Sequence, residues 1–125
     1  MTNTQKSKTV LVVEDEVFIR MSTVAMLEDA GYSVLEAKDS ADALSVLARH
    51  DEISIMVTDV RMPGSMDGLG LVAQVRCEYP VIRALVVSAH AGAADAYKAG
   101  AVGFLPKPYL AHSIVQAVWN MAKAA

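Results

Sequence analysis

Five polar residues each follow a short apolar segment, and their side chains are of the kinds used in phosphoryl transfer. They are Glu14, Asp15, Asp59, Ser88 and Lys107. A carboxylate can attack phosphorus to form an aspartyl phosphate, and the charge of the transferring group is then offset by a cation, an ammonium and a hydroxyl donor. Three clustered carboxylates repel one another unless a hard divalent cation lies among them. The residue types therefore predict a site for Mg²⁺, or the similar Mn²⁺, beside a nucleophilic carboxylate.

Asp59 is the best-placed nucleophile because it follows a continuous apolar run. Residues 53–57 are apolar apart from Ser54, which is typical of a strand buried on both faces, and Pro63 and Gly64 cannot extend it. Ligands of an open α/β sheet bind in the crevice outside the carboxyl ends of the strands. Alone, an Asp at this position is more simply a turn cap. The four companion residues favour the functional interpretation.

Strand-like segments alternate with helical patterns along the whole chain. Strands are predicted at 10–13, 33–37, 53–57, 83–88 and 102–105, and each precedes a helical pattern. This alternation implies α/β architecture: one doubly wound parallel sheet with right-handed crossovers and helices on both faces. Five strands and five helices fit the flavodoxin-like order 2-1-3-4-5, in which the first and third strands are neighbours. The acidic pair Glu14 and Asp15 should therefore lie beside Asp59.

Each expected helix has a capping residue, an apolar face, or both. Ser40 and Asp67 are assigned as the N-caps of the second and third helices, and the fourth is expected at 91–99. The stripe expected to face the core in the first helix is Val17, Met21, Val24 and Leu27. In the fifth helix, at 110–121, it is Ile114, Ala117, Val118 and Met121.

Composition limits the function classes. The chain has 125 residues, 54% of them apolar and 20% charged, which suits one domain with a substantial core. A net charge of −3 without a basic cluster argues against a nucleic-acid surface. Cys77 is the only cysteine, and no apolar run is long enough for a signal sequence or a membrane span. We expect a polar tail at 1–8, one domain at 9–125 and a cytoplasmic location.

These motifs resemble the receiver domain of two-component response regulators, of the stand-alone, single-domain type, over nearly the whole chain. The resemblance implies that Asp59 is the phosphoacceptor, Lys107 the phosphate-pairing lysine and Ser88 the switch hydroxyl. It also implies that Mg²⁺ is bound by the ligands Glu14 (mostly through water), Asp15, Asp59 and the backbone carbonyl of Arg61.

The resemblance further implies a switch aromatic, Phe104, and a cis Lys107–Pro108 peptide bond. Phosphorylation would draw Ser88 inward, let Phe104 turn in and reshape the face made by the fourth helix, fifth strand and fifth helix. Arg61 and His90 lie two residues beyond the phosphoacceptor and the switch hydroxyl, where we expect them to tune the lifetime of the phosphate. The loop after Asp59 is one residue longer than usual in this family.

The expected partners are a histidine kinase or histidine phosphotransfer protein and an unidentified downstream protein. The chain would be a signalling phosphoacceptor, not an enzyme with an external substrate, and would be a monomer or a phosphorylation-dependent homodimer, without direct nucleic-acid or membrane contact. One alternative is a Mg²⁺-dependent phosphatase or phosphotransferase of the haloacid-dehalogenase type, but that family places a second Asp where Arg61 stands. A nucleotide-binding module is a second alternative, although the turn after the first strand lacks phosphate-cradling glycines.

Overall fold

The computed structural model describes residues 8–123, so most of the expected tail and the last two residues lie outside the described part. Strands and helices alternate in the order β1 (Thr9–Val13), α1 (Val17–Asp29), β2 (Ser33–Ala37), α2 (Ser40–Arg49), β3 (Ile53–Asp59), α3 (Gly68–Glu78), β4 (Arg83–Ser88), α4 (Ala93–Ala99), β5 (Gly103–Pro106) and α5 (Ala111–Lys123). None of the helices within residues 8–123 has the length and apolar character needed to cross a bilayer.

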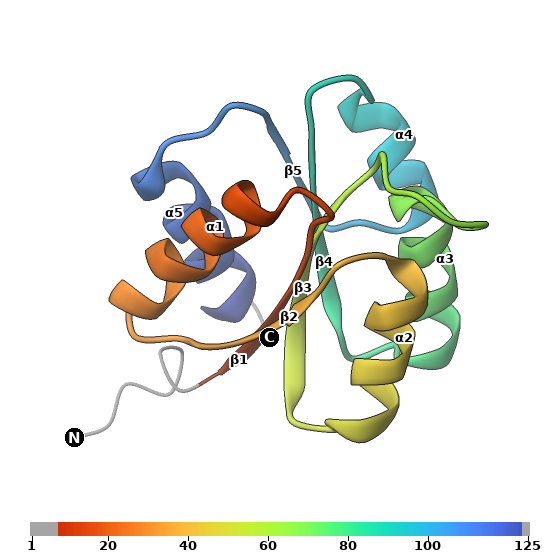
Figure 1. The fold of residues 1–125 in the computed structure, drawn as a ribbon, viewed down its shortest axis with the longest axis horizontal. Helices are drawn as coiled ribbons and strands as arrows, with labels where there is room; N and C mark the ends of the chain where they lie inside the picture. Colours follow the sequence, from red (N-terminus) through yellow and green to blue (C-terminus); the bar gives the residue numbers. More distant parts are fainter. Residues whose placement is uncertain (1–7, 124–125) are drawn as a thin grey trace.

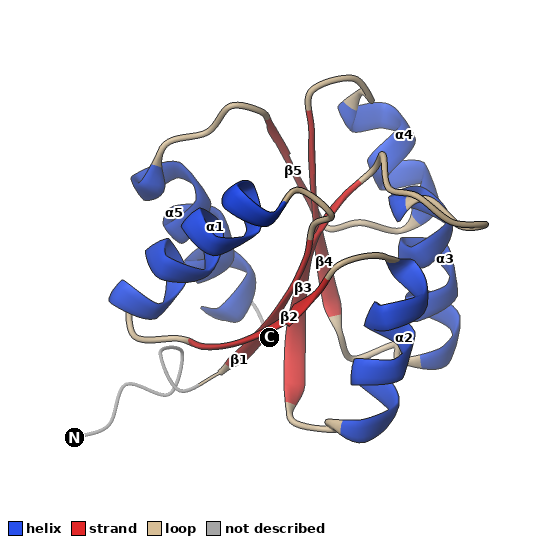
Figure 2. Cartoon of the chain, in the orientation of Figure 1, coloured by secondary structure: helices blue, strands red, loops and turns tan. Residues whose placement is uncertain are grey.

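The five strands form one parallel sheet in the order β2-β1-β3-β4-β5, which confirms the predicted topology. Helices α1 and α5 cover one face, and α2, α3 and α4 cover the other (Figures 1 and 2). Because every strand is parallel, all five carboxyl ends meet at one edge of the sheet. The side chains that follow β1, β3, β4 and β5 are therefore brought to the same edge.

Alternating side chains of the central strands supply two separate cores. Leu11, Met56 and Val86 pack under α2, α3 and α4, whereas Val12, Val57 and Leu85 pack under α1 and α5. Each fully buried aliphatic side chain of this kind contributes about 1.5–3 kcal/mol to stability. Burial on both faces explains why β1 and β3 are apolar almost without interruption.

The predicted inward stripe of α1 was partly wrong. Val17 and Met21 are 47% and 59% exposed, whereas Thr23 and Leu27 are buried and Arg20 is half-buried. Arg20, Thr23 and Leu27 are separated by three and four residues, so they share one helix face. Leu27 and Val24 do pack into the core, as predicted, but hydropathy missed Arg20 and Thr23 because hydrogen-bond partners offset the burial of their polar side chains.

Two further boundaries differ from the prediction for local reasons. The N-cap of α2 is Asp39, whose carboxylate accepts a hydrogen bond from the backbone N–H of Asp42, and Ser40 is the first helical residue. Helix α4 is shorter than expected because it begins at Ala93, after Gly92. The predicted N-cap Asp67 is confirmed, since its side chain accepts from the backbone N–H of Gly70.

The start of α3 lies directly against the backbone of Asp59. The N–H of Gly68 donates to the carbonyl oxygen of Val60 at 2.8 Å. A Cβ atom at position 68 would collide with the carbonyl oxygen of Asp59. Gly68 is therefore required for the close approach of α3 to the end of β3.

We predict that Gly68→Ala lowers the free energy of unfolding by about 1–3 kcal/mol, because the added methyl group forces two backbone segments apart. The matched control is Gly92→Ala, since a Cβ atom there meets nothing within 4 Å. The control should cost less than about 1 kcal/mol. Urea unfolding followed by circular dichroism measures both values, and equal losses would contradict the steric assignment.

Candidate functional site

The three carboxylates expected at the sheet edge do converge. Strands β1 and β3 are direct neighbours, with Val13 paired to Thr58, so the residues that follow them lie side by side. One carboxylate oxygen from each of Glu14, Asp15 and Asp59 lies within 4.8 Å of the others. The side chains of Glu14 and Asp59 are buried, whereas Asp15 is exposed. The acids therefore form a compact cluster that solvent reaches from one side.

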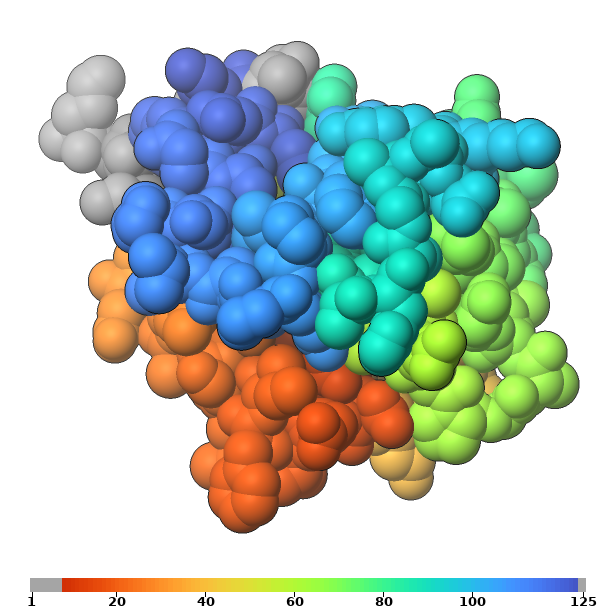
Figure 3. Space-filling model, turned by 90° about the horizontal axis from the view of Figure 1, so that it is seen from above, coloured from red at the N-terminus to blue at the C-terminus, as the bar shows by residue number. Residues whose placement is uncertain are grey.

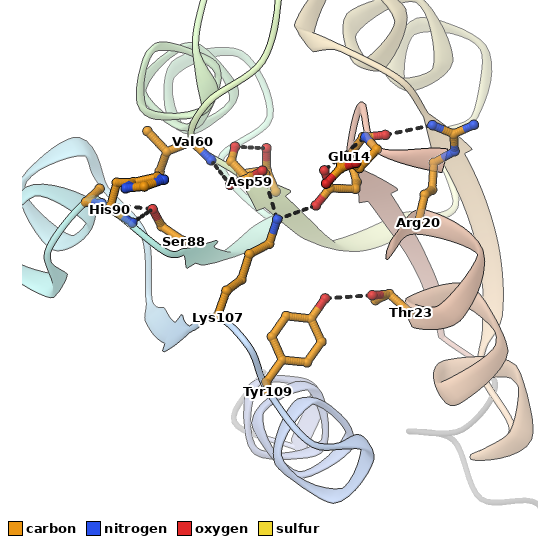
Figure 4. Close-up of polar contacts among 12 residues, drawn as sticks. Glu14, Arg20, Thr23, Asp59, Val60, Ser88, His90, Lys107 and Tyr109 are labelled. Carbon is orange, nitrogen blue, oxygen red and sulfur yellow. Dashed lines mark hydrogen bonds and ion pairs between the residues drawn. The ribbon is translucent and has the colours of Figure 1, made fainter. Parts of the chain in front are cut away.

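Lys107 bridges the two buried acids (Figure 4). Its Nζ atom donates to Glu14 Oε1 at 2.6 Å and to Asp59 Oδ2 at 2.9 Å. The backbone N–H of Lys107 donates to the carbonyl oxygen of Ser88 at 3.0 Å, which fixes the start of the β5–α5 loop against β4. The peptide bond between Lys107 and Pro108 is cis, as the resemblance implied.

Burial and charge act in opposite directions on these groups. Removal from water raises the pKa of Glu14, and the hydrogen bonds from Lys107 and the backbone N–H of Glu16 lower it only in part. Burial alone would lower the pKa of Lys107, but its hydrogen bonds to Glu14 and Asp59 outweigh burial and raise it. The lysine therefore stays protonated at neutral pH and offsets the charge of the acids.

The two oxygens of Asp59 have different partners. Oδ1 accepts from the backbone N–H of Val60 at 2.7 Å, and Oδ2 accepts from Lys107. Hydrogen bonds to both oxygens fix the plane of the carboxylate and leave lone pairs for a cation or an electrophile. Thr58 supports this arrangement, because its hydroxyl donates to the carbonyl oxygen of Asp59 at 2.8 Å.

Ser88 ends β4 and is buried beside the acids. Its Oγ atom accepts from the backbone N–H groups of His90 at 3.1 Å and Ala91 at 2.9 Å. Both hydrogen bonds use the hydroxyl oxygen as acceptor, and residues 8–123 offer no acceptor for its proton. The hydroxyl proton is therefore uncommitted within the described residues and available to a further acceptor.

A cleft of about 710 Å³ opens above the cluster. Its lining includes Asp15, Asp59, Lys107 and the exposed residues Arg61 and His90. Seen from above in Figure 3, the red, yellow-green, teal and blue segments that carry these residues meet at the centre of one face.

Phe104 does not line this cleft. It is half-buried and packs with the core beneath α2, α3 and α4. In the sheet it is paired with Val86, two residues before Ser88. Phe104 is therefore connected to the cleft through the pairing of β5 with β4 and through the packing of β5 against α4.

The acidic cluster fits a hard divalent cation. Glu14, Asp15 and Asp59 offer carboxylate oxygens, the ligands that Mg²⁺ and Mn²⁺ prefer. A bound cation would supply positive charge to a phosphoryl group beside Asp59. Arg61 lines the same cleft, on the segment directly after Asp59.

Sequence reasoning missed three residues whose hydrogen bonds lie beside the cluster. Arg20 donates from Nη1 to the carbonyl oxygen of Glu14 at 2.7 Å and from Nε to Glu36 Oε1 at 3.0 Å. The hydroxyl groups of Thr23 and Tyr109 are 2.6 Å apart. Arg20 and Thr23 are spaced so that they share a helix face with Leu27, and this spacing was the available signal. A search for apolar residues alone overlooks it.

Comparisons with known proteins agree with this geometry. Residues 10–119 match the family model described as the response regulator receiver domain. Sensor kinase CckA of Brucella abortus (strain 2308) is 39% identical over 124 residues, which is 96% of this chain and 13% of that protein. The DNA-binding transcriptional regulator NtrC of Escherichia coli (strain K12) is 35% identical over 103 residues, 80% of this chain and 22% of that protein. The chain thus spans less than a quarter of the length of either relative.

Solved structures show the same fold. A response regulator receiver domain protein from Clostridium thermocellum has a TM-score of 0.85 at 27% identity, covering 94% of this chain and 95% of that one. The chemotaxis protein CheY4 of Vibrio cholerae has a TM-score of 0.84 at 28% identity, covering 92% and 98%. Because the family match runs from β1 into α5, this chain belongs to the response regulator receiver domain family.

Proposed function

We propose that this protein is a phosphoacceptor response regulator in which Asp59 receives the phosphoryl group. The observation that carries the proposal is the cluster of Glu14, Asp15 and Asp59 with Lys107 bonded to the acceptor carboxylate. In this proposal Asp15, Asp59 and the backbone carbonyl of Arg61 hold Mg²⁺ or Mn²⁺ directly, and Glu14 holds it mostly through water. In this proposal the protein does not turn over an external substrate, because the product is the phosphorylated protein itself.

The residues of the chain would share the charge of the transferring group. An oxygen of Asp59 attacks phosphorus, a new O–P bond forms, and the bond from phosphorus to the donor breaks. The ammonium of Lys107 is already bonded to Asp59 Oδ2, so it can pair with a phosphoryl oxygen without a large movement. The free proton of Ser88 supplies the second donor.

The proposed donor is a histidine kinase or a histidine phosphotransfer protein. Receiver domains pair with such kinases, and a relative of this chain is named a sensor kinase. Because such kinases use ATP, we propose a cytoplasmic location.

We further propose that residues 9–125 form the receiver domain, that residues 1–8 are a polar tail, and that the protein is a monomer or dimerises when phosphorylated. Signalling then goes through an unidentified downstream protein, without direct contact with nucleic acid or membrane.

We predict that acetyl phosphate labels the protein at Asp59 only when Mg²⁺ or Mn²⁺ is present, because the acids otherwise repel an anion. Asp59→Asn should abolish labelling, whereas Asp95→Asn, at an exposed position on α4, should not. Intact-mass spectrometry with and without EDTA measures both. Equal labelling without a divalent cation, or in the Asp59→Asn protein, would refute the assignment.

We predict that Arg61→Ala and His90→Ala each shorten the half-life of the phosphoprotein by about two- to tenfold, a barrier change of roughly 0.4–1.4 kcal/mol. Both side chains line the cleft, so their truncation admits water to the phosphoryl group. Lys98→Ala, an exposed change on α4, is the control. Half-lives of both variants that equal or exceed the parental value would contradict the prediction.

We predict that the phosphate mimic beryllofluoride, with Mg²⁺, shifts amide resonances of Phe104, α4 and α5 as well as those around Asp59. The reason is that a charge-assisted bond from Ser88 would displace the end of β4, to which β5 is paired. The Asp59→Asn protein, treated identically, should show no such shifts. Changes confined to the Asp59 cleft would rule out this output surface.

A further inference from the structure

Among residues 8–123, one side-chain hydrogen bond joins α1 to the loop that carries Lys107. The hydroxyl groups of Thr23, on α1, and Tyr109, in the β5–α5 loop, are 2.6 Å apart although 86 residues separate them in the sequence. Figure 4 shows the ring of Tyr109 directed from the loop toward Thr23, below Lys107. Both residues also line the cleft that contains Asp59.

This bond lies where a polar group needs a partner. Thr23 is only 2% exposed, and Tyr109 is half-buried against the core that lies between the sheet and helices α1 and α5. A buried hydroxyl without a partner is costly, so each of these two groups satisfies the other. Burial also raises the pKa of Tyr109, which therefore keeps its proton at neutral pH.

The loop is fixed on both sides of the Lys107 side chain. On one side, the backbone N–H of Lys107 donates to the carbonyl oxygen of Ser88 on β4. On the other side, two residues further along the chain, the Tyr109 hydroxyl is bonded to α1. The ammonium between these two attachments makes bonds of 2.6 Å and 2.9 Å to the acids.

We propose that Tyr109 and Thr23 are positioning residues for phosphoryl transfer, which act by holding the Lys107 ammonium against Asp59. Neither residue touches the reacting atoms. The inference rests on the proposed function, because it assigns a role in the reaction that Lys107 assists. A small displacement of a charged group that stabilises a transferring phosphoryl group lowers the rate even when the fold is intact.

The test compares Tyr109→Phe, Thr23→Val and the double variant with the parent. Each single change removes one hydroxyl and keeps the shape of the side chain. Thr23→Ser keeps the hydroxyl and serves as the rescue variant. Tyr32→Phe is the matched control, because Tyr32 is buried and its hydroxyl has no partner among residues 8–123.

The first measurement is the rate constant of phosphorylation by acetyl phosphate at saturating Mg²⁺, well below the unfolding temperature. We expect each single variant to be slower by about three- to tenfold, the effect of losing one hydrogen bond. The double variant should be no slower than the slower single variant, since both changes break the same bond. The affinity for Mg²⁺, measured by titration for each variant, sets the Mg²⁺ concentration at which the rate is compared.

A purely structural bond gives a different result. In that case the variants lose stability but are phosphorylated within about twofold of the parental rate, and this outcome overturns the proposal. The proposal is also overturned if the rate losses of the two single variants multiply in the double variant. It is likewise overturned if the Thr23→Ser protein is phosphorylated as slowly as Thr23→Val. Tyr32→Phe should match the parent in rate.

A second measurement separates this inference from the proposed function. The ¹⁵N resonance of the Lys107 ammonium, identified by its loss in Lys107→Met, reports the position of the ammonium without any phosphorylation. We expect it to shift in Tyr109→Phe and Thr23→Val and to keep its position in Thr23→Ser and Tyr32→Phe. A parent that is not phosphorylated would defeat the proposed function, and the ammonium resonance would still decide whether the bond positions Lys107.

Discussion

Repulsion between carboxylates buried at one sheet edge is the constraint on which this structure depends. Two like charges about 5 Å apart repel by roughly 3 kcal/mol at an effective dielectric constant near 20. The protein offsets this repulsion with Lys107, which bonds both buried acids, and with Arg20, which bonds the backbone of Glu14. Each cation comes from a different element, so the acids can be close only when β5 and α1 are correctly placed.

The topology meets this requirement with short connections. Because β1 and β3 are adjacent, the acids need no long loop to reach one another, and the backbone geometry at Gly68 keeps the chain after Asp59 compact. Two apolar cores, one on each face, hold the strands that carry the acids. Central strands that are mostly apolar, with the polar residues of the site at or just after their carboxyl ends, give a site whose geometry is set before any ligand arrives.

The fold was predictable from the sequence because its signals are local and repeated. Apolar runs ending in Glu14, Asp59 and Ser88 marked both the strands and the site, and the strand order followed from their number. The supporting contacts were not predictable in the same way. Arg20 and Thr23 lie on the buried face of α1, and only the packed structure shows that Glu14 and Tyr109 are their partners. A pattern search that rewards hydrophobicity assigns such residues to solvent.

The two backbone amides bonded to Ser88 have a mechanical consequence. Because the N–H groups of His90 and Ala91 both donate to Oγ, the hydroxyl is attached to the segment that leads into α4. When the oxygen moves, either that segment moves with it or both bonds break, at a combined cost of about 1–3 kcal/mol. A movement of the Ser88 side chain therefore moves the β4–α4 connection as well. A displacement of the hydroxyl that is too small to disturb the core can therefore change the position of surface residues at the start of α4.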